Sequence, residues 1–214
     1  MVKKLLILGL AFVLFGPACV LLAIGVLMNP AAANCAVPGG SVTVGNIPDS
    51  LTVTTQDGTT FTLNRQQLTH AATIITIGNS IKGVDRPGIK IALIAALTES
   101  TLRQLANTSA YPESANYPND GNGGDHDSLG LFQMRPQSAE LMDTTYQARA
   151  FYGGPDGPNY PSPRGLLDIP GWAQMDPGEA AQTVEVSAYP DRYRNYEPVA
   201  ERILDALTGA AGAA

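Results

Sequence analysis

The stretch that decides the fold is residues 87–100, PGIKIALIAALTES. Its centre, Ile91 to Leu97, is apolar at every position, so a helix built from it has no polar face and must be buried on all sides. The alanines within the run favour a helix over a strand. We therefore expect a buried helix that begins near Pro87 and ends near Ala106.

The remaining elements follow from local pattern. Two β-type runs, residues 51–56 and 59–63, flank Asp57-Gly58, a pair that favours a tight hairpin turn. Apolar spacing and capping residues predict further helices at residues 65–81, 137–143, 144–152, 177–188 and 197–208. Residues 107–127 and 153–170 are expected as loops, and residues 189–195 as a turn. The fold class is thus mainly α (α+β), with a small N-terminal β-hairpin at residues 51–64.

The N-terminus has the pattern of a targeting segment. Lys3 and Lys4 precede an uncharged, mostly apolar run at residues 5–28, and small residues follow it up to Ala33. This arrangement is typical of a secretory signal peptide, and the run is also long enough for a membrane anchor. Both alternatives place the rest of the chain in a secreted or extracytoplasmic location. Residues 34–50 are expected as a linker and residues 209–214 as a flexible tail.

Charge and cysteine content exclude several classes of function. The net charge is −6 and no basic stripe is visible, which argues against nucleic acid as a partner. Cys35 is the one cysteine after the apolar run, so the chain beyond it has no internal disulfide. The role of Cys35 stays open. The domain must be stabilised by packing alone.

Glu99 follows the buried run directly. A carboxylate at the end of a buried helix is partly desolvated, which raises its pKa and keeps a proton available for a leaving oxygen, as glycosidic cleavage requires. The alternative is an ordinary surface pair with Arg103, four residues further along the same helix.

Three further motifs follow Glu99-Ser100 in order: Gly130-Leu131-Phe132-Gln133, the helix at residues 146–152, and Ala188-Tyr189. Over about residues 70–205 this ordered set resembles the lysozyme-like superfamily, in particular its branch of soluble lytic transglycosylases and goose-type lysozymes. Two positions depart from that family. Pro190 stands where the family usually has Asn, and Asp127-Ser128 stand where it often has Gly-Ala.

The resemblance implies a lysozyme-like helical catalytic domain at residues 65–208 that cleaves the MurNAc-GlcNAc β-1,4 bond of peptidoglycan strands. As a lytic transglycosylase it would use Glu99 as acid and then as base, without a cofactor or metal. The residues implied to bind substrate, with Tyr189 beside Glu99, are Ser100, Gly130, Leu131, Phe132, Gln133 and Tyr189.

Several alternatives stay open. A hydrolysing muramidase would need a second carboxylate, for which Asp125 and Asp127 are candidates, although Asp is also common in Gly-rich turns. Neither Asp125-His126-Asp127 nor the distant His70 has the spacing of a metal site. A non-catalytic cell-wall glycan-binding module and an accessory factor of a secretion or conjugation apparatus are the rival functions.

Some of these residue types also have ordinary packing roles. Gln133 is equally compatible with capping its own loop, and Asp120 with turn chemistry. Tyr193 and Tyr196 are expected to pack with solvated hydroxyls, and Trp172 to lie in the core.

Overall fold

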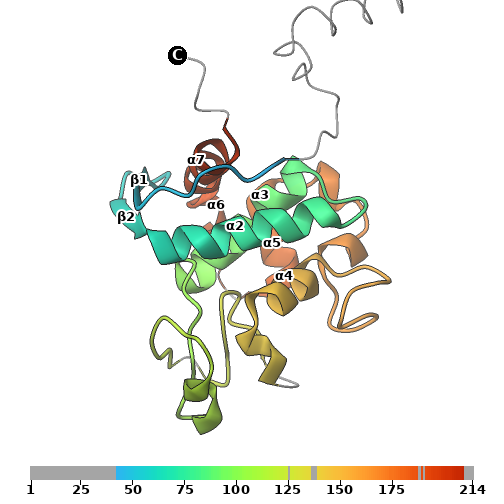
Figure 1. Cartoon of the computed structure of the whole chain (residues 1–214). Coiled ribbons are helices and arrows are strands. Elements are labelled where there is room, and N and C mark those ends of the chain that lie inside the picture. Colours follow the sequence, from blue (N-terminus) through green and yellow to red (C-terminus); the bar gives the residue numbers. More distant parts are fainter. Residues whose placement is uncertain (1–41, 125, 136–138, 188, 190, 210–214) are drawn as a thin grey trace, which may run out of the picture. The chain divides into compact units, whose positions relative to one another are not determined.

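The computed structural model describes residues 42–124, 126–135, 139–187, 189 and 191–209 (Figure 1). The expected signal peptide or anchor at residues 1–33, linker residues 34–41, Asp125 and the tail beyond residue 209 lie outside the described residues. Within the described part, no helix is long and apolar enough to cross a membrane. The fold is mainly α with one two-stranded antiparallel sheet, as the sequence predicts.

The hairpin forms where the Asp57-Gly58 pair predicts it. Strand β1 (Ser50–Thr54) pairs with β2 (Thr60–Asn64) in antiparallel register, with Leu51 opposite Leu63. Both leucines are buried, whereas the threonines on the other face are exposed. A two-stranded sheet is marginal alone, and this one packs against helices α2 (Arg65–Ser80) and α7 (Glu197–Thr208).

Helix α3 (Arg86–Ser100) is the centre of the domain (Figure 1). Every residue of its run Ile91–Leu97 is at most 2% exposed, which confirms the burial that the sequence predicts. Helices α2, α5 (Pro177–Glu185) and α7 all pack against it.

The prediction that this helix ends near Ala106 is wrong. Helix α3 ends at Ser100, because Thr101 and Leu102 adopt left-handed backbone conformations with φ of 56° and 60°. The amides of Thr101 and Leu102 donate back to the carbonyls of Leu97 and Ala96, which terminates the helix. Helix α5 also ends early, at Glu185 and not near residue 188, because Val186 is left-handed with φ of 53°. Glu99 and Glu185 therefore both lie in the last turn of a helix.

The other boundaries follow their caps. Asn64 and Gln67 form a capping box at the start of α2, and Asp143 caps α4 (Thr144–Tyr152). Helix α4 and helix α7 have the predicted bounds. The expected helix at residues 137–143 is a 3-10 turn at Ala139–Met142, within its described part. The expected turn at residues 189–195 contains a short helix, α6 (Asp191–Arg194). Three further 3-10 turns occur in the loops, at Pro112–Asn116, Leu166–Asp168 and Trp172–Gln174.

Gly78 in α2 provides a test of the packing around α3. Glycine-to-alanine changes inside helices usually stabilise by about 1 kcal/mol. At Gly78 the added methyl group would lie 2.6 Å from Tyr152 Oη and 2.7 Å from Ile89 Cγ1. The Tyr152 hydroxyl donates to the Ile74 carbonyl, so the ring is held in place. We expect Gly78→Ala to lower the free energy of unfolding by about 1–3 kcal/mol, measured by urea denaturation.

The matched control is Gly124→Ala, because a methyl group there meets nothing within 4 Å. We expect it to change the free energy of unfolding by less than about 0.5 kcal/mol. Equal effects of the two substitutions would contradict the close packing of α2 on Tyr152.

Candidate functional site

The Gly130–Gln133 segment forms a tight turn inside the domain. Leu129 and Met134 close it with two reciprocal backbone hydrogen bonds of 2.9 and 3.1 Å. Gly130 has φ of 80° and a close approach to the Gln147 side chain, so no Cβ fits there. Leu131 and Phe132 at the centre of the turn are fully buried.

Side chains from two helical regions hold this turn against α3. The Ser100 hydroxyl donates to the Leu131 carbonyl at 2.7 Å. The Leu131 amide donates to Gln104 Oε1 at 3.1 Å, and the Phe132 amide donates to Gln147 Oε1 at 3.2 Å. The structure therefore brings Ser100 together with the Gly130–Gln133 segment, directly beside Glu99 in the chain.

Gln133 caps its own turn. Its Nε2 donates to the Gly130 carbonyl at 2.8 Å, and its backbone is left-handed with φ of 46°. The structure thus shows the capping role that the sequence left open, and a contact of Gln133 with substrate stays a prediction.

Glu99 lies in the last turn of α3 and is half-buried. The hydroxyl of Tyr193 on α6 donates a hydrogen bond to Glu99 Oε1. Burial of the Tyr193 ring, followed by its contact with Glu99, raises the pKa of this tyrosine above its ordinary value. Tyr193 therefore stays protonated and acts as a hydrogen-bond donor.

The prediction that Tyr193 packs with a solvated hydroxyl is wrong, because this hydroxyl donates a hydrogen bond to Glu99. The expected position of Tyr189 beside Glu99 stays a prediction. Tyr189 is 65% exposed, and its ring centre lies 6.0 Å from the guanidinium carbon of Arg192. Side-chain direction depends on the helix, and α6 was not predicted, so the sequence held no signal that pointed Tyr193 inward. A role for Tyr189 in binding substrate stays a prediction.

A second carboxylate near Glu99 comes from the end of α5. Glu185 Oε1 is sealed from solvent and has no hydrogen-bond partner among the described residues. Burial, followed by the negative charge of Glu99, raises the pKa of Glu185 well above its ordinary value. The cause is physical: a carboxylate without partners or water is costly, and a second negative charge nearby adds to that cost. Sequence reasoning missed Glu185, because it carries no motif of its own.

The two aspartates proposed as second carboxylates are not placed at Glu99. Asp125 lies outside the described residues. Asp127 Oδ1 lies 3.0 Å from Arg135 Nε, an ion pair without hydrogen-bond geometry. The surrounding loop is held by Asn107, whose Nδ2 donates to the carbonyls of His126 and Ser128. A catalytic role for Asp125 or Asp127 stays a prediction.

The remaining candidates occupy other places. His70 pairs with Asp120 on a different face, at 2.7 Å between Nε2 and Oδ2. Trp172 is half-buried and packs against the core, as expected. In the described ranges, no group of three or more His, Cys, Asp or Glu side chains converges as a metal site would require.

No protein-family model matches the sequence, and a comparison with curated proteins found no match. Function must therefore be argued from the site alone.

The raised pKa of Glu185 has a consequence for stability. A group whose pKa is higher in the folded state favours folding fully at pH values below its unfolded pKa, and this contribution is lost as the pH rises toward the folded pKa. We expect Glu185→Gln, which cannot ionise, to gain stability relative to the wild type as the pH rises from about 4 to about 8. Urea denaturation at a series of pH values measures this difference.

Glu179 on the same helix provides the matched control, because its side chain is exposed. We expect the difference in stability between Glu179→Gln and the wild type to change little over the same pH range, because this side chain stays in contact with water in the folded state. A constant difference for Glu185→Gln over the same range would show that Glu185 is not desolvated.

Proposed function

We propose that this protein cleaves peptidoglycan glycan strands as a lytic transglycosylase, with Glu99 as the single acid and then base. The observation that carries the proposal is the hydrogen bond from the buried Tyr193 hydroxyl to Glu99 at the end of a buried helix. Clusters of perturbed titratable groups are typical of catalytic sites.

The carboxyl groups of Glu99 and Glu185 interact at the ends of α3 and α5. Both lie at the negative ends of helix dipoles, where negative charge is unfavourable. Burial, followed by the charge of Glu99, raises the pKa of Glu185 well above its ordinary value. The two carboxyl groups form a coupled pair that holds at least one proton to higher pH than an isolated glutamate would. General acid catalysis needs such a proton near neutral pH.

The proposed reaction balances with this one proton. Glu99 donates its proton to the glycosidic oxygen as the bond from that oxygen to C1 of MurNAc breaks. The resulting carboxylate then takes the proton of the C6 hydroxyl of the same sugar as O6 bonds to C1. The product is a 1,6-anhydro sugar, no water is consumed, and Glu99 ends protonated. The Tyr193 hydroxyl stabilises Glu99 during the interval in which it is charged.

Glu185 also bears on the choice between a lyase and a hydrolase. A hydrolysing muramidase of the two-carboxylate type needs a second carboxylate that is ionised and exposed to water or to C1. Glu185 is neutral over a wide pH range and its Oε1 is sealed, so it is unsuited to that task. This favours the single-glutamate scheme. A muramidase would have to use Asp125 or Asp127.

The proposed reaction requires export, and the rival functions differ in whether they need Glu99. Peptidoglycan lies outside the cytoplasmic membrane, so the proposal requires export, for which residues 1–33 supply the expected signal or anchor. A role as an accessory factor of a secretion or conjugation apparatus is compatible with the same reaction. A non-catalytic glycan-binding module would keep the fold without needing Glu99 protonated.

The decisive experiment is digestion of purified cell walls by the full chain, with the released muropeptides analysed by mass. We expect 1,6-anhydro products, and a loss of about 1,000-fold or more in rate for Glu99→Gln, since the acid is removed. Glu179→Gln serves as a control with an exposed glutamate. Reducing-end products would show hydrolysis instead. Wall binding without release of product would show a binding module.

Tyr193→Phe tests the hydrogen bond itself. Removal of a hydrogen bond to a charged group costs about 1.5–3 kcal/mol. If the bond matters most when Glu99 is charged, kcat should fall about 10- to 100-fold while KM changes little. Tyr196→Phe is the matched control, because Tyr196 is half-buried and packs edge-on against Phe61. Equal kcat values for Tyr193→Phe and the wild type would remove Tyr193 from the mechanism.

A further inference from the structure

The described part of the chain contains a pocket whose lining does not include Glu99. It has a volume of about 890 Å³ and opens between α2, the loop that contains Asp120, and the N-terminal end of α4. This volume is in the range of small-molecule sites. Its lining is mostly polar and consists of Gln66, His70, Thr73, Gln104, Tyr117, Pro118, Asn119, Asp120, Met142, Asp143, Thr144 and Thr145.

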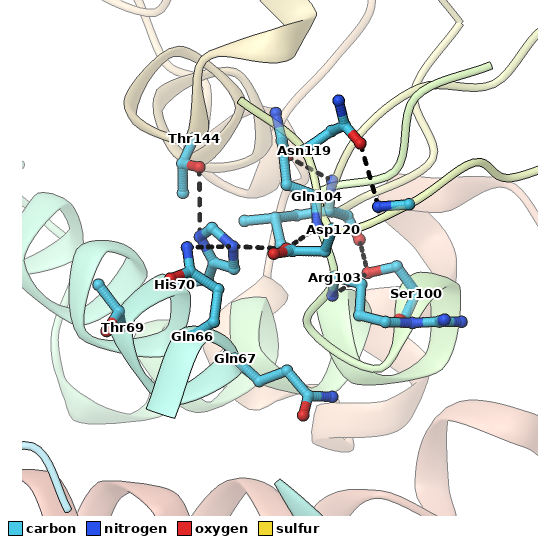
Figure 2. Close-up of polar contacts among 12 residues, drawn as sticks. Gln66, Gln67, Thr69, His70, Ser100, Arg103, Gln104, Asn119, Asp120 and Thr144 are labelled. Carbon is cyan, nitrogen blue, oxygen red and sulfur yellow. Dashed lines mark hydrogen bonds and ion pairs between the residues drawn. The ribbon is translucent and has the colours of Figure 1, made fainter. Parts of the chain in front are cut away.

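His70 lines this pocket and is held by the polar contacts that Figure 2 shows. Its Nε2 lies 2.7 Å from Asp120 Oδ2, and its Nδ1 lies 3.5 Å from Thr144 Oγ1. The Gln104 amide donates to the same Asp120 oxygen at 2.8 Å. The imidazole is therefore oriented from two sides, and the site is largely preorganised. Preorganisation reduces the entropy lost when a ligand binds.

Some polar atoms that line the pocket form no hydrogen bond with other described residues. Across the described residues, Asp120 Oδ1 and Thr145 Oγ1 have no hydrogen-bond partner. The Gln66 amide has one long contact, 3.4 Å to His70 Nε2. A purely structural His-Asp pair does not require further donors and acceptors around an open space.

The kinds of side chain indicate the class of ligand. No lysine or arginine lines the pocket, and two carboxylates do, so an anionic ligand is disfavoured. Amides and hydroxyls can both donate and accept, which suits the many hydroxyl groups of a sugar. Tyr117 is 39% exposed, and with Pro118 and Met142 it offers apolar surface for the C–H face of a sugar ring.

We propose that this pocket binds an uncharged saccharide at a site separate from Glu99. Its lining does not include Glu99, Tyr193, Glu185 or any residue of the Gly130–Gln133 segment, although one lining residue, Gln104, also accepts a hydrogen bond from the Leu131 amide. The elements differ as well, because the pocket uses α2 and α4 whereas Glu99 meets α6. The proposal does not depend on turnover at Glu99. It gives the protein a second point of attachment to a glycan strand.

The test is an NMR titration of the isotope-labelled full chain, in mild detergent, with N,N′,N″-triacetylchitotriose as the probe. Glu99→Gln in the background prevents cleavage. We expect the amide signals of residues 66–73, 119–120 and 144–145 to shift in a saturable manner. The double variant Gln66→Ala/Thr145→Ala should weaken the affinity measured from these signals about tenfold or more, since two hydrogen bonds are lost. If amide signals at Gly130–Gln133 also shift, the affinity measured from those signals should be the same in the double variant as in its parent.

Gln174→Ala is the matched control, because Gln174 is exposed and distant from the pocket lining. It should leave the affinity unchanged. The proposal is overturned if the pocket signals do not shift, if the double variant binds as tightly as its parent, or if only a free peptide stem shifts them. A protein that releases no product from cell walls can still pass this test, so the two proposals fail independently.

Discussion

The structure depends on the burial of one helix segment. Ile91–Leu97 has no polar side chain, so α3 must be surrounded, and α2, α5 and α7 pack against it. Glu99 follows this segment closely and is half-buried, whereas its neighbours Thr98 and Ser100 are buried. Its carboxyl group therefore lies at the edge of the core.

Two residues with left-handed backbone conformations determine where the helices beside Glu99 end. Thr101 terminates α3 and Val186 terminates α5, so Glu99 and Glu185 occupy the last turns of neighbouring helices. Both carboxyl groups meet the negative ends of helix dipoles, and one of them has a buried oxygen without a partner. This arrangement lowers stability at neutral pH. Natural sequences keep such costs mainly at functional sites, where an uncharged glutamate is useful.

The buried helix, the hairpin and the caps of α2 and α5 could be predicted, because each depends on local pattern: an apolar run, an Asp-Gly turn, an Asn64 or Asp176 N-cap. The ends of α3 and α5 could not, because neither Thr nor Val favours a left-handed conformation and tertiary contacts impose it. Because the end of α5 was predicted wrongly, the residues that meet Glu99 were not predicted either. With α5 expected to continue past Glu185 and α6 not expected, nothing in the sequence directed Glu185 or Tyr193 toward Glu99.

Gln104 makes hydrogen bonds both in the pocket and in the turn beside Glu99. Its backbone amide donates to Asp120 beside His70, and its side-chain oxygen accepts from the Leu131 amide in the Gly130–Gln133 turn. Figure 2 shows Gln104 next to Asp120. Gln104 is 2% exposed, so neither bond can be exchanged for water at low cost. Gln104 therefore positions both Asp120 in the pocket and the Gly130–Gln133 turn beside Ser100. A substitution of Gln104 would disturb both regions at once, so it cannot distinguish their roles.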